Sequence, residues 1–218
     1  EEAVDHVIQT PTILETKANI NPTGYIHIPQ SNIFIGREEI HKGLNWYTTH
    51  ERLAENNLFM PTPTLFMQHF TNVVHAIQNK TTLYDGNGTP LAQTDIEDLY
   101  QYLTKDHKGG CWTWLDAHFT TKSNKLVLET EHLMINGTLQ HKQKSLEAHV
   151  HEDAYVDISF NKQGLPHKKS QQQTYQQGKN IHYRHPRNNT VALFYADSIR
   201  AVLDCSNNPL NTNSALGV

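Results

Sequence analysis

The sequence contains few cysteines and no long apolar run. Its two cysteines, Cys111 and Cys205, are far apart, which excludes a disulfide-rich scaffold and a zinc site built from cysteines. One disulfide between them stays open, although Cys205 lies among apolar and small residues and also fits a small buried side chain. No apolar segment approaches the roughly 20 residues that span a bilayer, so we expect no membrane span.

Basic residues are also scarce. The 218 residues include 18 Lys and Arg against 22 Asp and Glu, a net charge of -4, and the Lys and Arg residues do not cluster. Because a basic surface is missing, we do not expect nucleic acid as a partner. The length and the 37% hydrophobic content suffice for a real core. We expect an N-terminal arm at residues 1–40, with a strand or two, packed on one domain at residues 41–218.

The C-terminal stretch of the chain lacks several residue types. Residues 180–218 contain no Lys, Gln, Glu, Met or Trp, although these five types make up roughly a fifth of the chain. Apolar and small residues recur there in a pattern that suits packing, and we call them the frame residues: Val191, Ala192, Phe194, Ala196, Ser198, Ala201, Leu203, Cys205, Pro209 and Ala215 to Val218. Between them stand what we call the interleaved residues: Leu193, Tyr195, Asp197, Ile199, Arg200, Val202, Asp204, Ser206, Asn207, Asn208, Leu210, Asn211, Thr212, Asn213 and Ser214.

The genetic code explains this gap. A codon of the form AAY encodes Asn, and when its two adenines are randomised, the pyrimidine in third place forbids Lys, Gln, Glu, Met and Trp. These are the five missing types, and several interleaved residues are still Asn. The frame V-A-x-F-x-A-x-S-x-x-A-x-L-x-C-x-x-x-P, closed by A-L-G-V, resembles the variable region of a diversity-generating retroelement variable protein, most closely the archaeal ones.

This resemblance implies a C-type lectin fold in its formylglycine-generating-enzyme-like form, with a variable region at about residues 188–218. It also implies that the interleaved residues bind a ligand and are displayed on a fixed scaffold at a cell or virion surface. The partner would be a protein or cell-surface molecule, and no cofactor is implied. Two other interpretations stay open: a solvated loop rich in Asn, Ser and Asp, and a structural domain without a ligand.

Periodicity predicts helices in the first half of the chain. A weak helical pattern covers residues 45–57. A clearer helix begins with Thr62 as its cap and Pro63 at its first position. A third helix is predicted to begin with a capping box over residues 94–97 and to end at Gly109 and Gly110.

Alternating apolar residues replace the helical pattern after Cys111. Helices followed by short strands predict an α+β domain, with helices packed on one side of an antiparallel sheet. A turn signal at Asn136 and Gly137 predicts a hairpin. The predicted strands cover residues 112–119, 125–133, 155–160, 180–183 and 190–196.

Motifs for catalysis are missing. The sequence has no G-x-S-x-G elbow and no phosphate-binding glycine loop. The calcium-binding motifs of true lectins and the paired catalytic cysteines of the formylglycine-generating enzyme also have no counterpart. We therefore expect neither an enzyme nor a bound metal. The alternative is a metal-dependent hydrolase in which His149 and His151, two apart on a strand, share a metal, although no third ligand stands at a recognised spacing.

Strand alternation gives the binding hypothesis a geometric form. If the frame residues of 190–196 face the core, Leu193, Tyr195 and Asp197 must face solvent. We expect the interleaved residues to form one contiguous exposed surface. The frame residues expected to be buried include Phe194, Leu203 and Leu216.

Overall fold

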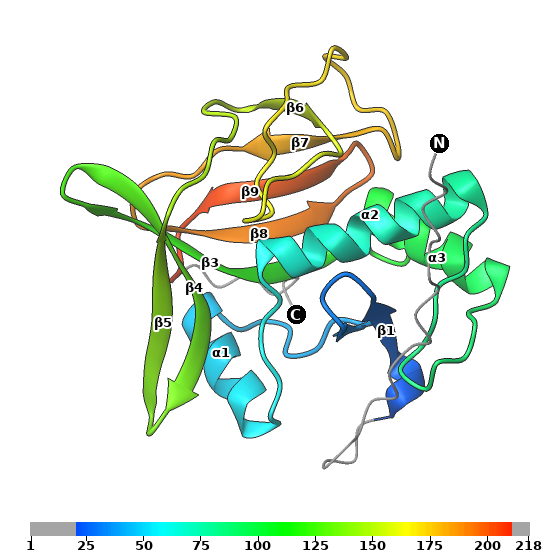
Figure 1. Ribbon diagram of the computed structural model, residues 1–218, viewed down its shortest axis with the longest axis horizontal. Coiled ribbons are helices and arrows are strands. Elements are labelled where there is room, and N and C mark those ends of the chain that lie inside the picture. Colours follow the sequence, from blue (N-terminus) through cyan, green and yellow to red (C-terminus); the bar gives the residue numbers. More distant parts are fainter. Residues whose placement is uncertain (1–20, 211–218) are drawn as a thin grey trace, which may run out of the picture.

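The computed structural model describes residues 21–210. It is an α+β protein with a mostly antiparallel sheet and three α-helices (Figure 1). The helices are α1 (Trp46–Glu55), α2 (Pro63–Asn79) and α3 (Gln93–Thr104), after a 3-10 turn, η1 (Pro22–Gly24). The strands are β1 (Tyr25–Ile28), β2 (Ile33–Gly36), β3 (Trp112–Lys122), β4 (Lys125–Ile135), β5 (Thr138–Ser145), β6 (Ala154–Asp157), β7 (Asn180–Arg184), β8 (Thr190–Ala196) and β9 (Ala201–Asn207).

Helix α2 begins where the sequence predicts. The Thr62 hydroxyl accepts a hydrogen bond from the Leu65 amide, and Pro63 occupies the first turn, where its missing N–H costs nothing. The helix buries one apolar stripe, which includes Phe66, Phe70 and Val73. Helix α1 is also confirmed, with the Asn45 side chain as its cap.

The predicted ends of α3 are wrong. Its N-cap residue is Ala92, which makes no side-chain hydrogen bond, and the helix ends at Thr104. Burial of its apolar stripe, rather than a cap, therefore sets its position. Gly110 has a different role: its φ of +66° is a left-handed conformation, and a Cβ atom there would collide with the Ala196 carbonyl.

The main sheet has seven strands in the order β5-β4-β3-β8-β9-β7-β6, and a separate hairpin pairs β1 with β2. The predicted hairpin between β4 and β5 is confirmed, because Asn136 and Gly137 both have positive φ angles, as a tight primed turn requires. Strands β3, β7 and β8 also match their predicted positions to within a few residues.

Strand β9 was not predicted. It pairs antiparallel with β8 and parallel with β7, so it lies between two strands that precede it in the chain. Ala201, Leu203 and Cys205 alternate with Val202 and Asp204, which is the period of two that a strand requires. All five side chains are buried, so the sheet continues through this segment rather than ending at β8.

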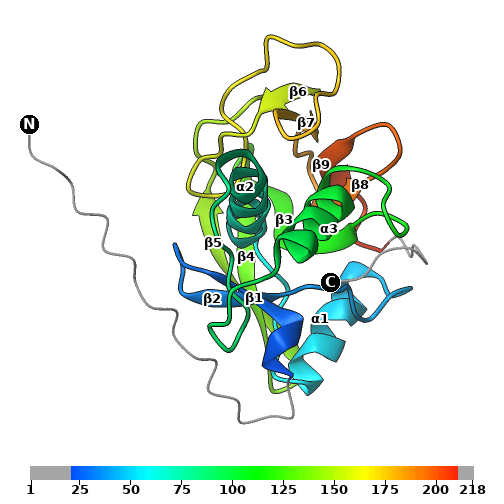
Figure 2. The same cartoon turned by 90° about the vertical axis from the view of Figure 1, so that its right-hand side faces the viewer.

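Two hydrophobic clusters lie on opposite faces of the sheet. The larger cluster contains the apolar residues of α2 and α3 together with six frame residues: Ala192, Phe194, Ala196, Ala201, Leu203 and Cys205. The smaller cluster contains Trp46 and Leu53 of α1, Trp114 of β3, and Leu193 of β8. Figure 2 shows α1 well away from α2 and α3, which lie together. Strand β8 is therefore covered on both faces.

We predict that truncation of Phe194 destabilises the protein strongly. Its ring contacts Phe66 and Phe70, with centroid distances of 4.8 and 5.4 Å, and none of it is exposed. Phe194→Ala should lower the free energy of unfolding by about 3 to 5 kcal/mol in urea denaturation. Ile199→Ala, at a side chain that is 72% exposed, should change it by less than about 0.5 kcal/mol. Similar losses for both variants would contradict the assignment of the two faces.

Candidate functional site

The interleaved residues of β8 and β9 share one face of the sheet. In the strand register, Leu193 lies opposite Asp204 and Tyr195 lies opposite Val202. The frame residues of the two strands point to the other face, apart from Val191, which belongs to the smaller cluster. Phe194 and Leu203 are buried, as predicted, whereas Leu216 lies outside the described residues.

The expected exposure of the interleaved residues is wrong at four positions: Leu193, Tyr195, Val202 and Asp204 are buried. Trp46 and Trp114 are packed in the same cluster as Leu193 and Val202. Tyr195 is 9% exposed and stacks on Trp112, with ring centroids 4.6 Å apart.

The cause is the segment around α1. It places a second apolar layer on the face of the sheet that the sequence pattern assigned to solvent. Asp204, by contrast, is not part of the apolar cluster. Its buried carboxylate accepts a hydrogen bond of 3.1 Å from the Arg184 guanidinium.

The remaining described interleaved residues reach the surface in two separate groups, so the expected single contiguous surface is wrong for the described residues. Ile199 is 72% exposed, in the turn between β8 and β9, with Asp197 and Arg200 half-buried beside it. Leu210 is 67% exposed beyond the other end of β9, after the exposed Asn208. Ser206 and Asn207 are half-buried there. Residues 211–214 lie outside the described residues.

Short polar side chains hold the backbone in both groups. The Asp197 carboxylate accepts hydrogen bonds from the amides of Ile199 and Arg200, at 2.7 and 2.8 Å. The Asn208 side chain accepts one from the Leu210 amide at 2.8 Å. Such bonds are typical of Asx turns. They leave the Ile199 and Leu210 side chains pointing outward on a defined backbone.

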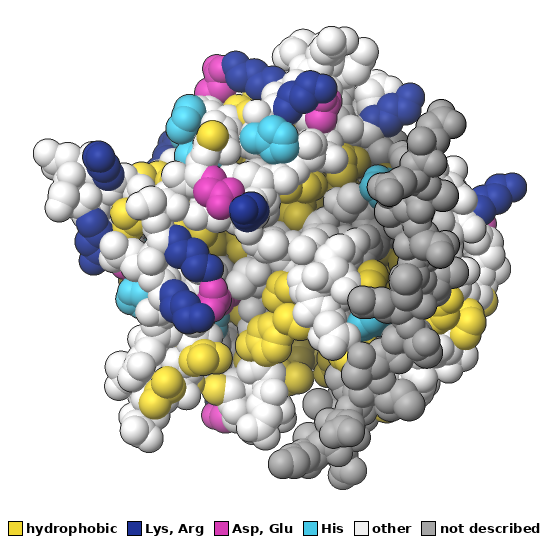
Figure 3. Space-filling model, in the orientation of Figure 1, with side chains coloured by type: hydrophobic (Ala, Val, Ile, Leu, Met, Phe, Trp, Pro, Cys, Tyr) yellow, Lys and Arg dark blue, Asp and Glu magenta, His cyan; other side chains and the backbone are white. Residues whose placement is uncertain are grey.

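Basic side chains lie beside the interleaved residues on the same sheet face. Arg184 pairs with Asp204, and His182 lies opposite Val202 in the parallel register. Burial lowers the pKa of His182, and the nearby Arg200 and Arg184 cations lower it further. On the face shown in Figure 3, by contrast, Lys and Arg side chains are scattered among acidic and neutral ones.

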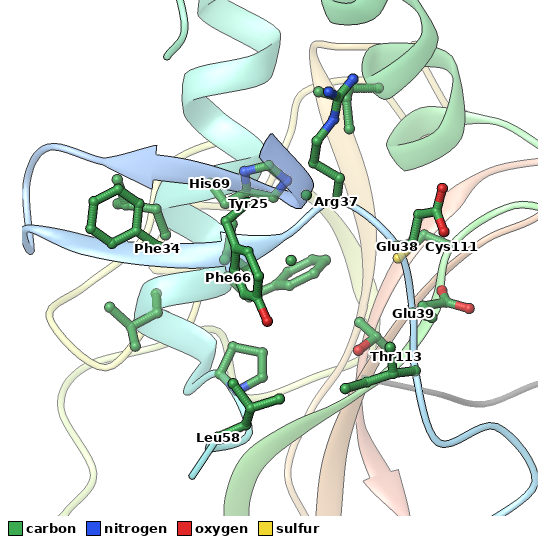
Figure 4. A pocket seen from close by; sticks show the side chains of 18 of the residues that line it. Tyr25, Phe34, Arg37, Glu38, Glu39, Leu58, Phe66, His69, Cys111 and Thr113 are labelled. Carbon is green, nitrogen blue, oxygen red and sulfur yellow. The ribbon is translucent and has the colours of Figure 1, made fainter. Parts of the chain in front are cut away.

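A separate cleft of about 1150 Å³ opens between the β1–β2 hairpin and the helices. Figure 4 shows Tyr25 and Phe34 on one side and Glu38, Glu39 and Cys111 on the other. The Glu39 carboxylate accepts a hydrogen bond from the Trp112 amide and lies 3.2 Å from the Lys42 ammonium, which explains its position beside the sheet.

Cys111 is not an activated nucleophile in this cleft. Burial raises the pKa of the Cys111 thiol, and the neighbouring Glu39 carboxylate raises it further. A thiol with a raised pKa stays protonated and is a poor nucleophile. Cys111 and Cys205 are both buried free cysteines, so the disulfide left open by the sequence is not formed.

His149 and His151 lie close together, with ring centroids 4.3 Å apart. They border a shallow cavity of about 390 Å³ together with His185, which the sequence did not connect to them. The Nδ1–H group of His149 donates to the Glu147 carbonyl oxygen at 2.8 Å, and His185 is hydrogen-bonded to Asp153 at 2.6 Å. Two of these imidazoles therefore already have partners in the protein.

A different trio converges more tightly. Within residues 21–210, one group of His, Cys, Asp and Glu side chains brings three metal-binding atoms within 4.8 Å of one another: His50, Asp116 and His132. The trio was not predicted from the sequence, because its residues belong to α1, β3 and β4 and no local spacing connects them. The only sequence signal was the unusual total of 15 histidines.

Comparisons of the chain with protein-family models, curated proteins and solved structures find no match. Within residues 21–210, no helix is long and apolar enough to cross a membrane. The case for a function therefore rests on the sequence pattern and the geometry described above.

We predict that His69, at the wall of the cleft, makes stability depend on pH. Burial lowers its pKa to about 4 from 6.5. As the pH falls from 6.5 towards 4, the unfolded chain gains a proton that the folded protein excludes, so stability is lost in this range. His69→Gln should reduce the loss between pH 6.5 and 4.5 by about 2 kcal/mol in urea denaturation. The matched control is His75→Gln, at an exposed position of the same helix; equal acid sensitivity of both variants would contradict the prediction.

Proposed function

We propose that the protein binds a macromolecular ligand, and that its recognition surface is diversified by a retroelement of the diversity-generating type. The fold would be the C-type lectin fold in its formylglycine-generating-enzyme-like form, and the described α+β architecture is compatible with it. One observation carries the proposal: six frame residues lie in the main core, whereas the interleaved residues of β8 and β9 share the opposite face. An ordinary terminal loop has no reason to keep this division.

The gap in residue types supports the same proposal. Residues 180–218 lack the five types that a randomised AAY codon cannot encode. Six of the nine frame residues that the structure describes lie in the main core, where their change would be damaging. Diversification of the exposed interleaved residues would then be tolerated because it spares the main core. This is the principle of a binding site built on a rigid scaffold.

The burial of four interleaved residues narrows the recognition surface. In the described part of the chain, the two exposed groups lie beyond the two ends of β9, a strand of seven residues, and so are about 20 Å apart. A small molecule cannot touch both groups. A protein partner can, because a standard interface covers about 800 Å² per partner, which is about 30 Å across. The geometry therefore favours a protein or another large cell-surface molecule as the ligand.

The chemistry of these groups also suits recognition. Ile199 in the first group and Leu210 in the second offer exposed apolar area. Arg200 offers a cation next to Ile199. Arg is enriched in the energetically important parts of interfaces. Neither of the two described groups contains an activated nucleophile, so we infer binding rather than catalysis. The proposed binding requires no cofactor. Display at a cell or virion surface is part of the same proposal.

The coding DNA provides the most direct test. We expect a near-repeat of the codons for residues 188–218 elsewhere in the same genome, with its differences at adenines. Across isolates, changes should fall in codons of interleaved residues such as Ile199 and Arg200 and spare those of Phe194 and Leu203. Sequencing the gene and its flanks in many isolates measures this. Changes spread evenly along the gene would refute the proposal.

A display library tests the scaffold independently. Codons of the NNY form at Ile199, Arg200, Asn208 and Leu210 should leave most clones folded, as judged by protease resistance at the display surface, and selection on a panel of proteins should yield binders. A matched library at four frame residues should lose folding in most clones, because large-to-small core changes cost about 2 to 5 kcal/mol each. If both libraries unfold equally, the exposed groups are structural and the proposal fails.

A further inference from the structure

The side chains of His50, Asp116 and His132 meet beneath α1, and all three are buried. Asp116 is central: its Oδ1 atom lies 2.5 Å from His132 Nδ1 and 3.8 Å from His50 Nε2. The three residues come from α1, β3 and β4. This junction joins the helix to the sheet.

Two irregularities in the sheet create the junction. The register between β3 and β8 shifts between Leu115 and His118, and the register between β4 and β5 shifts between Thr130 and Leu133. Asp116 lies in the first shift and His132 in the second. Beta-bulges re-aim side chains and recur next to functional sites. Here both bulges direct polar groups to one buried point.

An ion pair alone does not account for the trio. Asp116 and His132 could satisfy each other, since the His132 amide also donates to Asp116 Oδ2 at 3.0 Å. His50 Nε2, however, is buried and has no hydrogen-bond partner among the described residues, although it points towards the same carboxylate. A buried imidazole nitrogen without a hydrogen-bond partner, aimed at a carboxylate, is placed as a metal ligand would be.

The surroundings also match those of a metal site. The Thr130 hydroxyl donates to the Asp116 carbonyl at 2.7 Å, which fixes the backbone that carries the carboxylate. The Trp46 ring packs edge-on against both imidazoles, with centroid distances of 4.3 Å to His50 and 4.9 Å to His132. Such supporting contacts orient ligands before a metal arrives.

His141 of β5 lies between the trio and the surface. Its ring lies 5.2 Å from that of His132, and its side chain is 37% exposed. His141 is therefore available as a further ligand to an ion held by the trio.

We infer that His50, Asp116 and His132 bind one divalent transition metal, with zinc as the best match to two imidazoles and a carboxylate. Ligand atoms on one tetrahedral zinc lie about 3.3 Å apart. The distance of 3.8 Å between His50 Nε2 and Asp116 Oδ1 needs little change. Asp116 Oδ1 and His132 Nδ1, now 2.5 Å apart, must separate by about 1 Å and replace their hydrogen bond with bonds to the metal. A water molecule or His141 completes the coordination.

The metal would be structural. It would hold α1 against the irregular part of the sheet. Trp46 of α1 would then be held in the smaller hydrophobic cluster, which also contains Leu193 and Val202. This role differs from the hydrolase considered at His149 and His151, and it does not depend on the proposed ligand-binding function. No metal was expected from the sequence, because residues that are distant in sequence and share no local spacing give no motif for a metal site.

Zinc titration of the full chain tests the inference. After treatment with a chelator and dialysis, calorimetry should show one Zn²⁺ bound per chain with a Kd below about 1 µM, and zinc should raise the melting temperature. His50→Gln should weaken zinc binding at least about 100-fold, because it removes a direct ligand. The matched control is His151→Gln, which should bind zinc like the wild type.

His50→Gln is the informative variant because it leaves the pair of Asp116 and His132 intact. In chelator, its melting temperature should lie within about 4 °C of the wild type, so that lost binding is not a result of unfolding. A second measurement needs no variant: wild-type crystals soaked in zinc should show an anomalous peak between the three side chains. No saturable binding at about 100 µM zinc, or a peak at His149 and His151 instead, would overturn the inference.

Discussion

The burial of β8 on both faces is the constraint on which the rest of the structure depends. All seven of its residues are buried, so each side chain must fit one of two different cores. Helices α2 and α3 supply the core around Phe194, and α1 supplies the core around Leu193. A slip of one residue would exchange the two sets and disrupt both cores, which specifies the register strongly. The position of α1, the smaller cluster and the proposed metal site all follow from this central strand.

Local signals in the sequence predicted much of the fold. Thr62 and Pro63 located the start of α2, and Asn136 with Gly137 located a hairpin, because caps and turns depend on a few neighbouring residues. Alternation predicted β8 correctly. The exposure of Tyr195 was predicted wrongly because alternation says which residues share a face, and not what covers that face. Helix α1, far away in the sequence, decides that question.

The same limit applies to candidate sites. His149 and His151 drew attention because they are neighbours in the sequence, yet His149 is engaged by a backbone carbonyl. The tighter group around Asp116 depends on two bulges in different strands and on the docking of a helix. Such shifts insert extra residues into one strand of a pairing, and a regular pattern of apolar residues does not reveal them. Long-range convergence of this kind requires the three-dimensional structure.

The position of β9 has a consequence for how the chain folds. It lies between β7 and β8, although it follows both in the chain. During synthesis, the sheet therefore stays divided into two parts, each with an open edge, until residues 201–207 have left the ribosome. Open edges invite pairing with other chains, and domains that depend on late, long-range contacts form slowly. Before β9 forms, the edges of β8 and β7 are therefore unpaired, and insertion of this one strand closes both of them.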